Sequence, residues 1–235
     1  MRSMPVATIG AGVARPAIVA DAPVHPSAGL AGHAVESIDE TRARRQIEVI
    51  ATMTADFVRA GIVHWLTGGW AVDFHLGRVS RNHSDIDVVL WVTDRELATR
   101  VLTRRGFRLD HSRSSDGVEL FVDPVEHIEV TYIGLAADGS VVTPGFEHWP
   151  YQPCSFGDEH RSLRGVRAPV TSVATLLDTK CNWEREVGDP PRPHDLADIE
   201  ALRAIAGSCT RPPRHQPTPP SAPSHRPHHE DRPCT

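Results

Sequence analysis

Apolar residues in the first third of the chain recur at the spacing of an α-helix. Between residue 40 and Gly61 they fall mostly three or four positions apart, which predicts a helix with one apolar face. Residues 37–40 read Ser-Ile-Asp-Glu, the pattern of a capping box, so Ser37 is expected to cap this helix and Gly61 to end it. The apolar positions are Ile47, Val49, Ile50, Met53, Phe57 and Val58.

Shorter apolar runs follow, separated by glycine, proline and polar residues. They predict strands at residues 62–66, 85–92, 107–109, 118–122 and 128–133. Further helices are predicted at residues 70–76, 93–106, 172–186 and 194–206, the second opening with a capping box at Thr93 and the third capped by Ser172. Residues 134–170 match no regular pattern. Because helices alternate with strands early and cluster late, we expect an α+β fold, a small mixed β-sheet backed by helices, with C-terminal helices.

The two ends of the chain have a different composition. Residues 1–35 are rich in Ala, Pro, Gly and Val without a sustained period, and residues 208–235 are rich in Pro and His. Neither segment has enough core-forming residues to fold. We therefore predict a disordered leader over 1–35, one folded domain over 36–207 and a disordered tail over 208–235.

Charge and cysteine content narrow the class of protein. The net charge of -5 provides no overall basic field, which argues against a partner such as long DNA or RNA. No segment is long enough to span a bilayer. The cysteines have neither zinc-site spacing nor the density of a disulfide framework, so we expect reduced thiols in a cytoplasmic monomer or homodimer. They are Cys154, Cys181, Cys209 and Cys234.

Two aspartates at the start of a predicted strand are the first candidates for chemistry. Asp85 and Asp87 are two residues apart, so on a strand both carboxylates project from the same face. Carboxylates this close repel each other unless a cation lies between them, and magnesium prefers such hard oxygen ligands. Taken alone, the pair also fits a solvated acidic loop before a strand.

The setting of the aspartates favours the metal interpretation. Thr67-Gly-Gly69 is predicted to turn from one strand into the next helix, and backbone N–H groups at such a turn bind phosphate. A third carboxylate is expected from the neighbouring strand, where Glu129 alternates with apolar residues. Glu129 is the candidate for the metal site and for the general base, with Asp123 and Glu126 as rivals.

Residues 68–87 also resemble a known family. The run Gly-Gly-Trp-Ala-Val-Asp, followed by Leu-Gly-Arg, Arg-x-His and Asp-Ile-Asp, is similar to the aminoglycoside 2''-adenylyltransferase and lincosamide nucleotidyltransferase branch of the DNA polymerase β-type superfamily. The resemblance is tight over residues 68–89, looser over 62–133, and fades beyond, apart from helices near Lys180 and at residues 195–198.

The resemblance implies a nucleotidyltransferase fold and roles for individual residues. Gly68 and Gly69 would hold the triphosphate of ATP, and Asp85, Asp87 and Glu129 would bind Mg2+ and act in catalysis. Arg81 and His83 would contact phosphate or order the metal loop. Lys180 is either a phosphate ligand or a surface lysine.

The sequence departs from the superfamily pattern at two positions. Trp70 follows the two glycines where many members have Ser or Thr, so Thr67 is a possible replacement for that hydroxyl. The third acid is Glu129 where this branch often has Asp.

Together these features predict an enzyme that transfers AMP from ATP to a hydroxyl of a small molecule. The expected acceptor is an aminoglycoside or lincosamide antibiotic, bound in part by residues 134–170. An acidic pocket would suit a cationic aminoglycoside, with candidate carboxylates Glu119, Asp123, Glu126 and Glu147. Two alternatives remain: a nucleotidyltransferase that modifies a protein, as in toxin–antitoxin pairs, and a nucleotide-binding module without catalysis.

Overall fold

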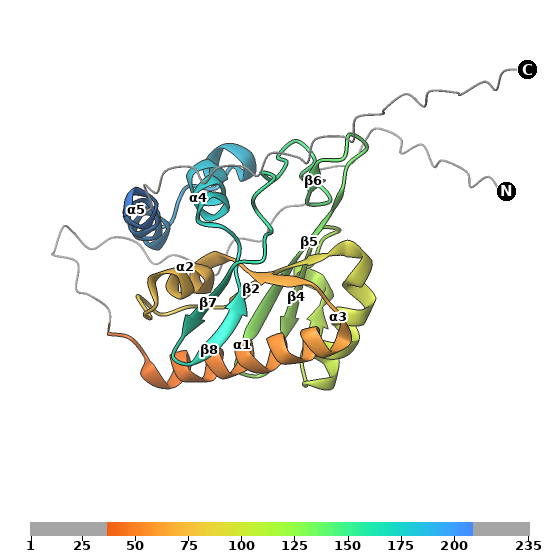
Figure 1. Ribbon diagram of the computed structural model, residues 1–235. Coiled ribbons are helices and arrows are strands. Elements are labelled where there is room, and N and C mark those ends of the chain that lie inside the picture. The colour runs from red at the N-terminus through yellow and green to blue at the C-terminus, as the bar shows by residue number, and fades with distance from the viewer. Residues whose placement is uncertain (1–36, 209–235) are drawn as a thin grey trace, which may run out of the picture.

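The computed structural model describes residues 37–208 (Figure 1). The predicted leader lies outside these residues, as does the predicted tail apart from Ser208, the last residue of α5. The helices are α1 (Glu40–Ala60), α2 (Gly68–Leu76), α3 (Arg95–Arg104), α4 (Val173–Val187) and α5 (Pro193–Ser208). The strands are β1 (His64–Leu66), β2 (Ile86–Trp91), β3 (Arg108–Asp110), β4 (Val118–Val122), β5 (His127–Leu135), β6 (Val141–Val142), β7 (His160–Leu163) and β8 (Val166–Pro169).

The strands form a mixed sheet and a separate hairpin. The order across the sheet is β1-β2-β5-β4-β3, and β6 pairs with the far end of β5. Among the paired strands of residues 37–208, β2 and β5 alone are parallel, so these two strands begin at the same edge of the sheet. The β7–β8 hairpin joins this arrangement through a bridge between Leu66 and Val170. The α+β prediction with a mixed sheet and C-terminal helices is confirmed.

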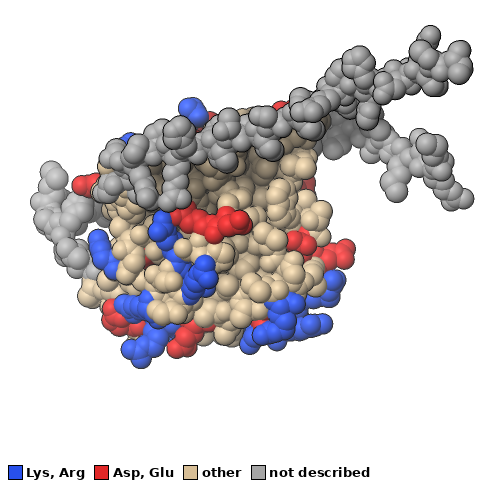
Figure 2. Space-filling view, viewed as in Figure 1, with Lys and Arg blue, Asp and Glu red and all other residues tan. Residues whose placement is uncertain are grey.

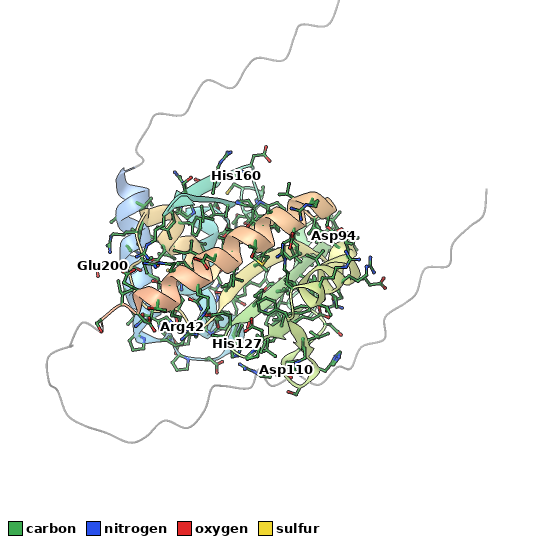
Figure 3. The ribbon with its side chains drawn as sticks, turned by 90° about the horizontal axis from the view of Figure 1, so that it is seen from below. Arg42, Asp94, Asp110, His127, His160 and Glu200 are labelled. Carbon is green, nitrogen blue, oxygen red and sulfur yellow. The ribbon has the colours of Figure 1, made fainter. Side chains whose placement is uncertain are left out.

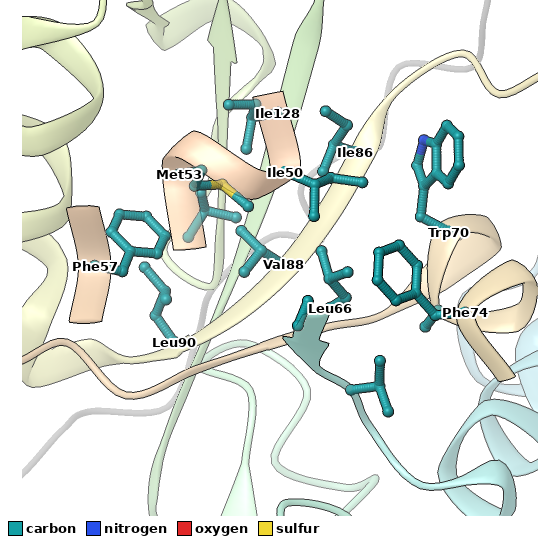
Figure 4. Close-up of a cluster of buried hydrophobic side chains, with 14 of the residues drawn as sticks. Ile50, Met53, Phe57, Leu66, Trp70, Phe74, Ile86, Val88, Leu90 and Ile128 are labelled. Carbon is teal, nitrogen blue, oxygen red and sulfur yellow. The ribbon is translucent and has the colours of Figure 1, made fainter. Parts of the chain in front are cut away.

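Alternation along β2 and β5 gives the sheet two different faces. Ile86, Val88 and Leu90 belong to the main core, together with Ile128 and the buried side chains of α1 and α2 (Figure 4). The intervening residues point to the opposite face because successive strand residues alternate. On that face, Val89 and Ile133 belong to a second cluster, together with Val141 and the aromatic residues Trp65, Trp91, Tyr151 and Phe156. Asp87 and Glu129 share this second face.

Helix α1 lies across the strands on the core face, as seen from below in Figure 3. Its buried side chains include Ile50, Met53 and Phe57, which have the helical spacing noted in the sequence. Figure 1 shows α4 and α5 packed together at one end of the sheet, away from α3. None of the helices within residues 37–208 is long and apolar enough to cross a membrane.

Three details of the predicted elements are wrong. Helix α1 is capped by Asp39, whose carboxylate accepts a bond from the Arg42 N–H at 3.0 Å, whereas the Ser37 carbonyl bonds Asn82. The capping box at Thr93 does not form, because residues 92–94 make a 3-10 turn before α3. Strands β6 to β8 were not predicted, since strands of two to four residues leave no clear period. The helix end at Gly61 and the cap at Ser172 are confirmed.

Candidate active site

The aspartate pair and the third carboxylate meet at the edge where β2 and β5 begin. In the parallel register Asp87 lies directly opposite Glu129, and Asp85 precedes β2 by one residue. Within residues 37–208, no hydrogen bond or ion pair reaches the carboxylate of any of the three. The sequence-predicted acids are therefore brought together, and their oxygens are left without protein partners.

The three carboxylates affect one another electrostatically. Burial raises the pKa of Asp87 well above its usual range, and the neighbouring Asp85 and Glu129 raise it further. Burial also raises the pKa of Glu129, again with a contribution from Asp85. Such a group of acids is unfavourable when fully ionised unless a cation compensates the charge. Their carboxylate oxygens are of the type that divalent cations such as magnesium prefer as ligands.

The two glycines lie against this acidic group rather than in a separate turn. They form the first turn of α2, whose N-terminal N–H groups point out of the helix. Gly68 has a φ of +59°, and a Cβ placed on it would lie 1.8 Å from Asp87 Oδ2. The Thr67 N–H also donates to the Asp87 carbonyl at 3.0 Å. The structure thus places a helix N-terminus, which favours phosphate, in direct contact with Asp87.

Arg81 and His83 lie on the other side of the glycines. A Cβ on Gly69 would lie 2.3 Å from Arg81 Nη2 and 2.6 Å from His83 Nδ1. His83 is buried, stacks on Trp70 with ring centroids 4.3 Å apart, and has its Nε2 2.7 Å from Asp73 Oδ2. This packing fits a residue that orders the loop before β2. Arg81 is more accessible and faces the helix N-terminus with its guanidinium.

The C-terminal helices bring two cations toward the carboxylates. Lys180 on α4 is not a surface lysine, because its side chain is only 10% exposed and pairs with Asp195 and Asp198. Lys180 and Arg192 both lower the pKa of Asp87, and Arg192 also lowers that of Glu129. Arg192 was missed in the sequence, where it is one residue of a Pro-rich loop. Arg113, also missed, lowers the pKa of Glu129 from the short 3-10 helix that follows β3.

Comparison with known proteins assigns the chain to a family. The model of the family described as aminoglycoside-2''-adenylyltransferase matches residues 49–202, which contain all of the site residues above. The chain belongs to this family. A lincosamide resistance protein of Staphylococcus haemolyticus is 27% identical over 123 residues, covering 52% of this chain and 76% of the relative.

Solved structures of this family and of a lincosamide enzyme share the fold. The solution structure of the antibiotic-resistance factor ANT(2'')-Ia is similar with a TM-score of 0.56 and 23% identity, covering 70% of this chain and 84% of that one. The lincomycin-bound lincosamide adenylyltransferase LnuA has a TM-score of 0.51 and 21% identity, covering 72% and 98%. At these identities the likeness establishes the nucleotidyltransferase fold.

In this adenylyltransferase-family chain, the rivals of Glu129 have structural partners. Glu126 is 1% exposed, with Arg45 Nε 2.5 Å from its Oε1 and Gln46 Nε2 2.8 Å from its Oε2. Both partners belong to α1, on the core face of the sheet. Asp123 accepts backbone N–H bonds from residues 125 and 126, which closes the turn before β5. These contacts indicate that Glu126 and Asp123 hold α1 and a turn in place.

The acids proposed for an acidic acceptor pocket also make contacts within the protein. Glu119 accepts a bond from the Tyr132 hydroxyl at 2.6 Å and lies beside Arg95 of α3. Glu147 accepts the Gly145 N–H at 2.9 Å within a turn. Each of the four acids proposed from the sequence for a cationic acceptor therefore has a partner within the protein.

We expect Glu126→Gln and Glu129→Gln to have opposite effects. Glu126→Gln should lower the free energy of unfolding by about 1–3 kcal/mol, because it weakens a buried carboxylate's bonds to α1. It should leave turnover within about twofold of the parent, because the Glu126 carboxylate bonds Arg45 and Gln46 of α1 and none of the three acids at the sheet edge. Glu129→Gln should lower turnover strongly and stability little. Thermal unfolding and pyrophosphate release are measured on both variants. A Glu126→Gln variant that is stable but inactive would identify Glu126 as the general base.

Proposed function

We propose that this protein transfers AMP from ATP to a hydroxyl group of a small antibiotic, an aminoglycoside or a lincosamide. The observation that carries the proposal is the contact between Gly68 and Asp87, with Glu129 opposite Asp87 in the register. It puts a phosphate-binding helix N-terminus beside a group of unpartnered carboxylates, as transfer of a nucleotide requires. Membership of the family and the named relatives supply the acceptor class.

In this proposal each residue of the site has a stated role. The N–H groups at Gly68 and Gly69, with Arg81 beside them, bind the triphosphate and aim the α-phosphorus at the acceptor. His83 holds the loop that carries Asp85, and Lys180 and Arg192 offset the negative charge of the phosphates. Glu129 accepts the proton of the acceptor hydroxyl, whose oxygen attacks the α-phosphorus as pyrophosphate leaves. Most of the acceleration comes from positioning and charge compensation.

We assign a magnesium site to Asp85, Asp87 and Glu129. Their oxygens are the ligands that magnesium prefers, and their mutual repulsion fits a group that needs a cation. Among residues 37–208 no three His, Cys, Asp or Glu side chains are already gathered closely enough to hold an ion, so cation binding is part of the proposal. Bound magnesium supplies charge neutralisation at the transferring phosphate.

Incubation with ATP, magnesium and a panel of aminoglycosides and lincosamides tests the proposal. We expect one acceptor to gain the mass of AMP and equimolar pyrophosphate to appear, and both signals to vanish when EDTA removes the metal. The matched control is the Asp85→Asn/Asp87→Asn double variant, which should give neither signal. Detection of AMP on a protein instead of an antibiotic would show that the acceptor is a protein. Binding of ATP without pyrophosphate, for every acceptor, would indicate a non-catalytic module.

A further inference from the structure

One buried carboxylate joins the two cations that flank the site. Asp198 of α5 is 3% exposed, and its Oδ2 lies 2.9 Å from Lys180 Nζ and 3.1 Å from Arg81 Nη2. Its Oδ1 also accepts from Arg81 Nε at 3.4 Å. The contact spans 117 residues between the loop before β2 and α5, while Lys180 comes from α4. A single side chain therefore sets the relative position of two cations from different segments.

The two cations held by Asp198 reach different parts of the site. The Nη2 of Arg81 that bonds Asp198 is the atom that lies 2.3 Å from a Cβ placed on Gly69, so it borders the N-terminus of α2. Lys180 is close enough to Asp87 to lower the pKa of that carboxyl. Arg81 thus borders the phosphate-binding helix end, and Lys180 lies within electrostatic reach of Asp87.

The position of Asp198 is unfavourable for a site that binds a polyanion. A carboxylate between two cations reduces their attraction for phosphate, and a site built only for charge would omit it. Asp198 does, however, restrict two long side chains that could otherwise adopt many rotamers. Fixing these side chains in advance lowers the entropy that a ligand must remove when it binds.

We propose that Asp198 is a positioning residue for the nucleotide, which holds Arg81 and Lys180 ready for two different phosphates of the triphosphate. The inference rests on the proposed function and adds to it the residue that orders its cations. Asp195 does not share this task, because it pairs with Lys180 and Arg192 and not with Arg81.

The direction in which Asp198→Asn changes the affinity for ATP tests the proposal. Each positioned charge-assisted bond contributes about 1.5–3 kcal/mol, so we expect the dissociation constant of ATP with magnesium to rise about tenfold to a hundredfold. A carboxylate that only opposed the phosphates would give the reverse, tighter binding on neutralisation. Calorimetric titration without acceptor measures the constant, so the readout does not depend on turnover. Unchanged or tighter binding would overturn the proposal.

Two further variants separate positioning from charge and from folding. Asp198→Glu keeps the charge but moves the carboxylate by one methylene group, so positioning predicts weaker ATP binding and a charge role predicts the parent value. In an Arg81→Ala background, Asp198→Asn should have a smaller effect, since one of its partners is gone. Asp198→Glu also decides the case if Asp198→Asn does not fold.

Asp56→Asn is the matched control on the core face of the sheet. Asp56 is also a nearly buried carboxylate between two cations, Arg59 and Arg105, but neither touches the site. This variant should bind ATP like the parent even if its melting temperature falls. A parent protein that does not bind ATP would refute the proposed function and this inference together. A parent that binds ATP and releases pyrophosphate, with Asp198→Asn unchanged, would refute the inference alone.

Discussion

Replacing Asp87 by asparagine should lower the rate of pyrophosphate release at least about a thousandfold and leave the protein as stable as the parent, or more stable. A metal ion contributes several kcal/mol to charge stabilisation at a transferring phosphate, and the variant loses one of the three proposed ligands for it. Stability should not fall, because burial and the neighbouring acids raise the pKa of Asp87. Its ionised form is thus disfavoured in the fold, and a neutral isostere removes that cost.

Asp56→Asn is a control in which the expected effects on stability and turnover are reversed. Hydrogen bonding from Arg105 lowers the pKa of Asp56 to about 2, so its charged form stabilises the fold. The control should therefore lose stability and keep its turnover, whereas Asp87→Asn should keep stability and lose turnover. Thermal unfolding and a pyrophosphate assay are measured on both. Parent-like turnover of Asp87→Asn would refute the assignment of the site.

Replacing Gly68 by alanine should remove at least about 99% of the activity. The new Cβ would lie 1.8 Å from Asp87 Oδ2 and 2.5 Å from its Cγ, so the carboxylate or the start of α2 must move. A displacement of about 1 Å in a catalytic arrangement can cost about a hundredfold in rate. The positive φ of Gly68 adds strain, which for an L-residue costs about 1–2 kcal/mol. Activity and the free energy of unfolding should therefore fall together.

Gly77→Ala separates strain from collision. Gly77 ends the same helix with a φ of +70°, but nothing lies within 4 Å of a Cβ placed there. This variant should lose about 1–2 kcal/mol of stability through strain alone and retain its activity. Steady-state rates and chemical unfolding of the two variants compare the same substitution with and without Asp87 in its way. Equal activities would show that the contact between Gly68 and Asp87 has no catalytic importance.

The site illustrates how far local sequence reasoning extends. Asp85, Asp87 and Glu129 could be found because period-2 alternation puts them on one face, and the structure brings them together at one sheet edge. The glycines were expected in a turn before the helix and instead form its first turn. That difference favours phosphate binding at this place, because the helix N-terminus itself then lies against Asp87.

Residues that act through long-range contacts could not be placed from the sequence. Glu126 and Glu129 are both acids at the start of one strand, and only the packing of α1 pairs Glu126 with Arg45. From the sequence, Lys180 could equally be a surface lysine. Only the fold shows that it pairs with two carboxylates of α5. Arg192 carries no local pattern at all, since its effect on Asp87 depends on how α4 and α5 return to the sheet.

The sequence by itself determined the mixed α+β fold, the acidic edge and the family resemblance, because these depend on periodicity and on short motifs whose residues are neighbours in the chain. The tertiary structure alone decided which carboxylates are free and which are paired, and which cations face the site. Those properties depend on contacts between residues far apart in sequence, such as Arg81 and Asp198, and no local spacing records them.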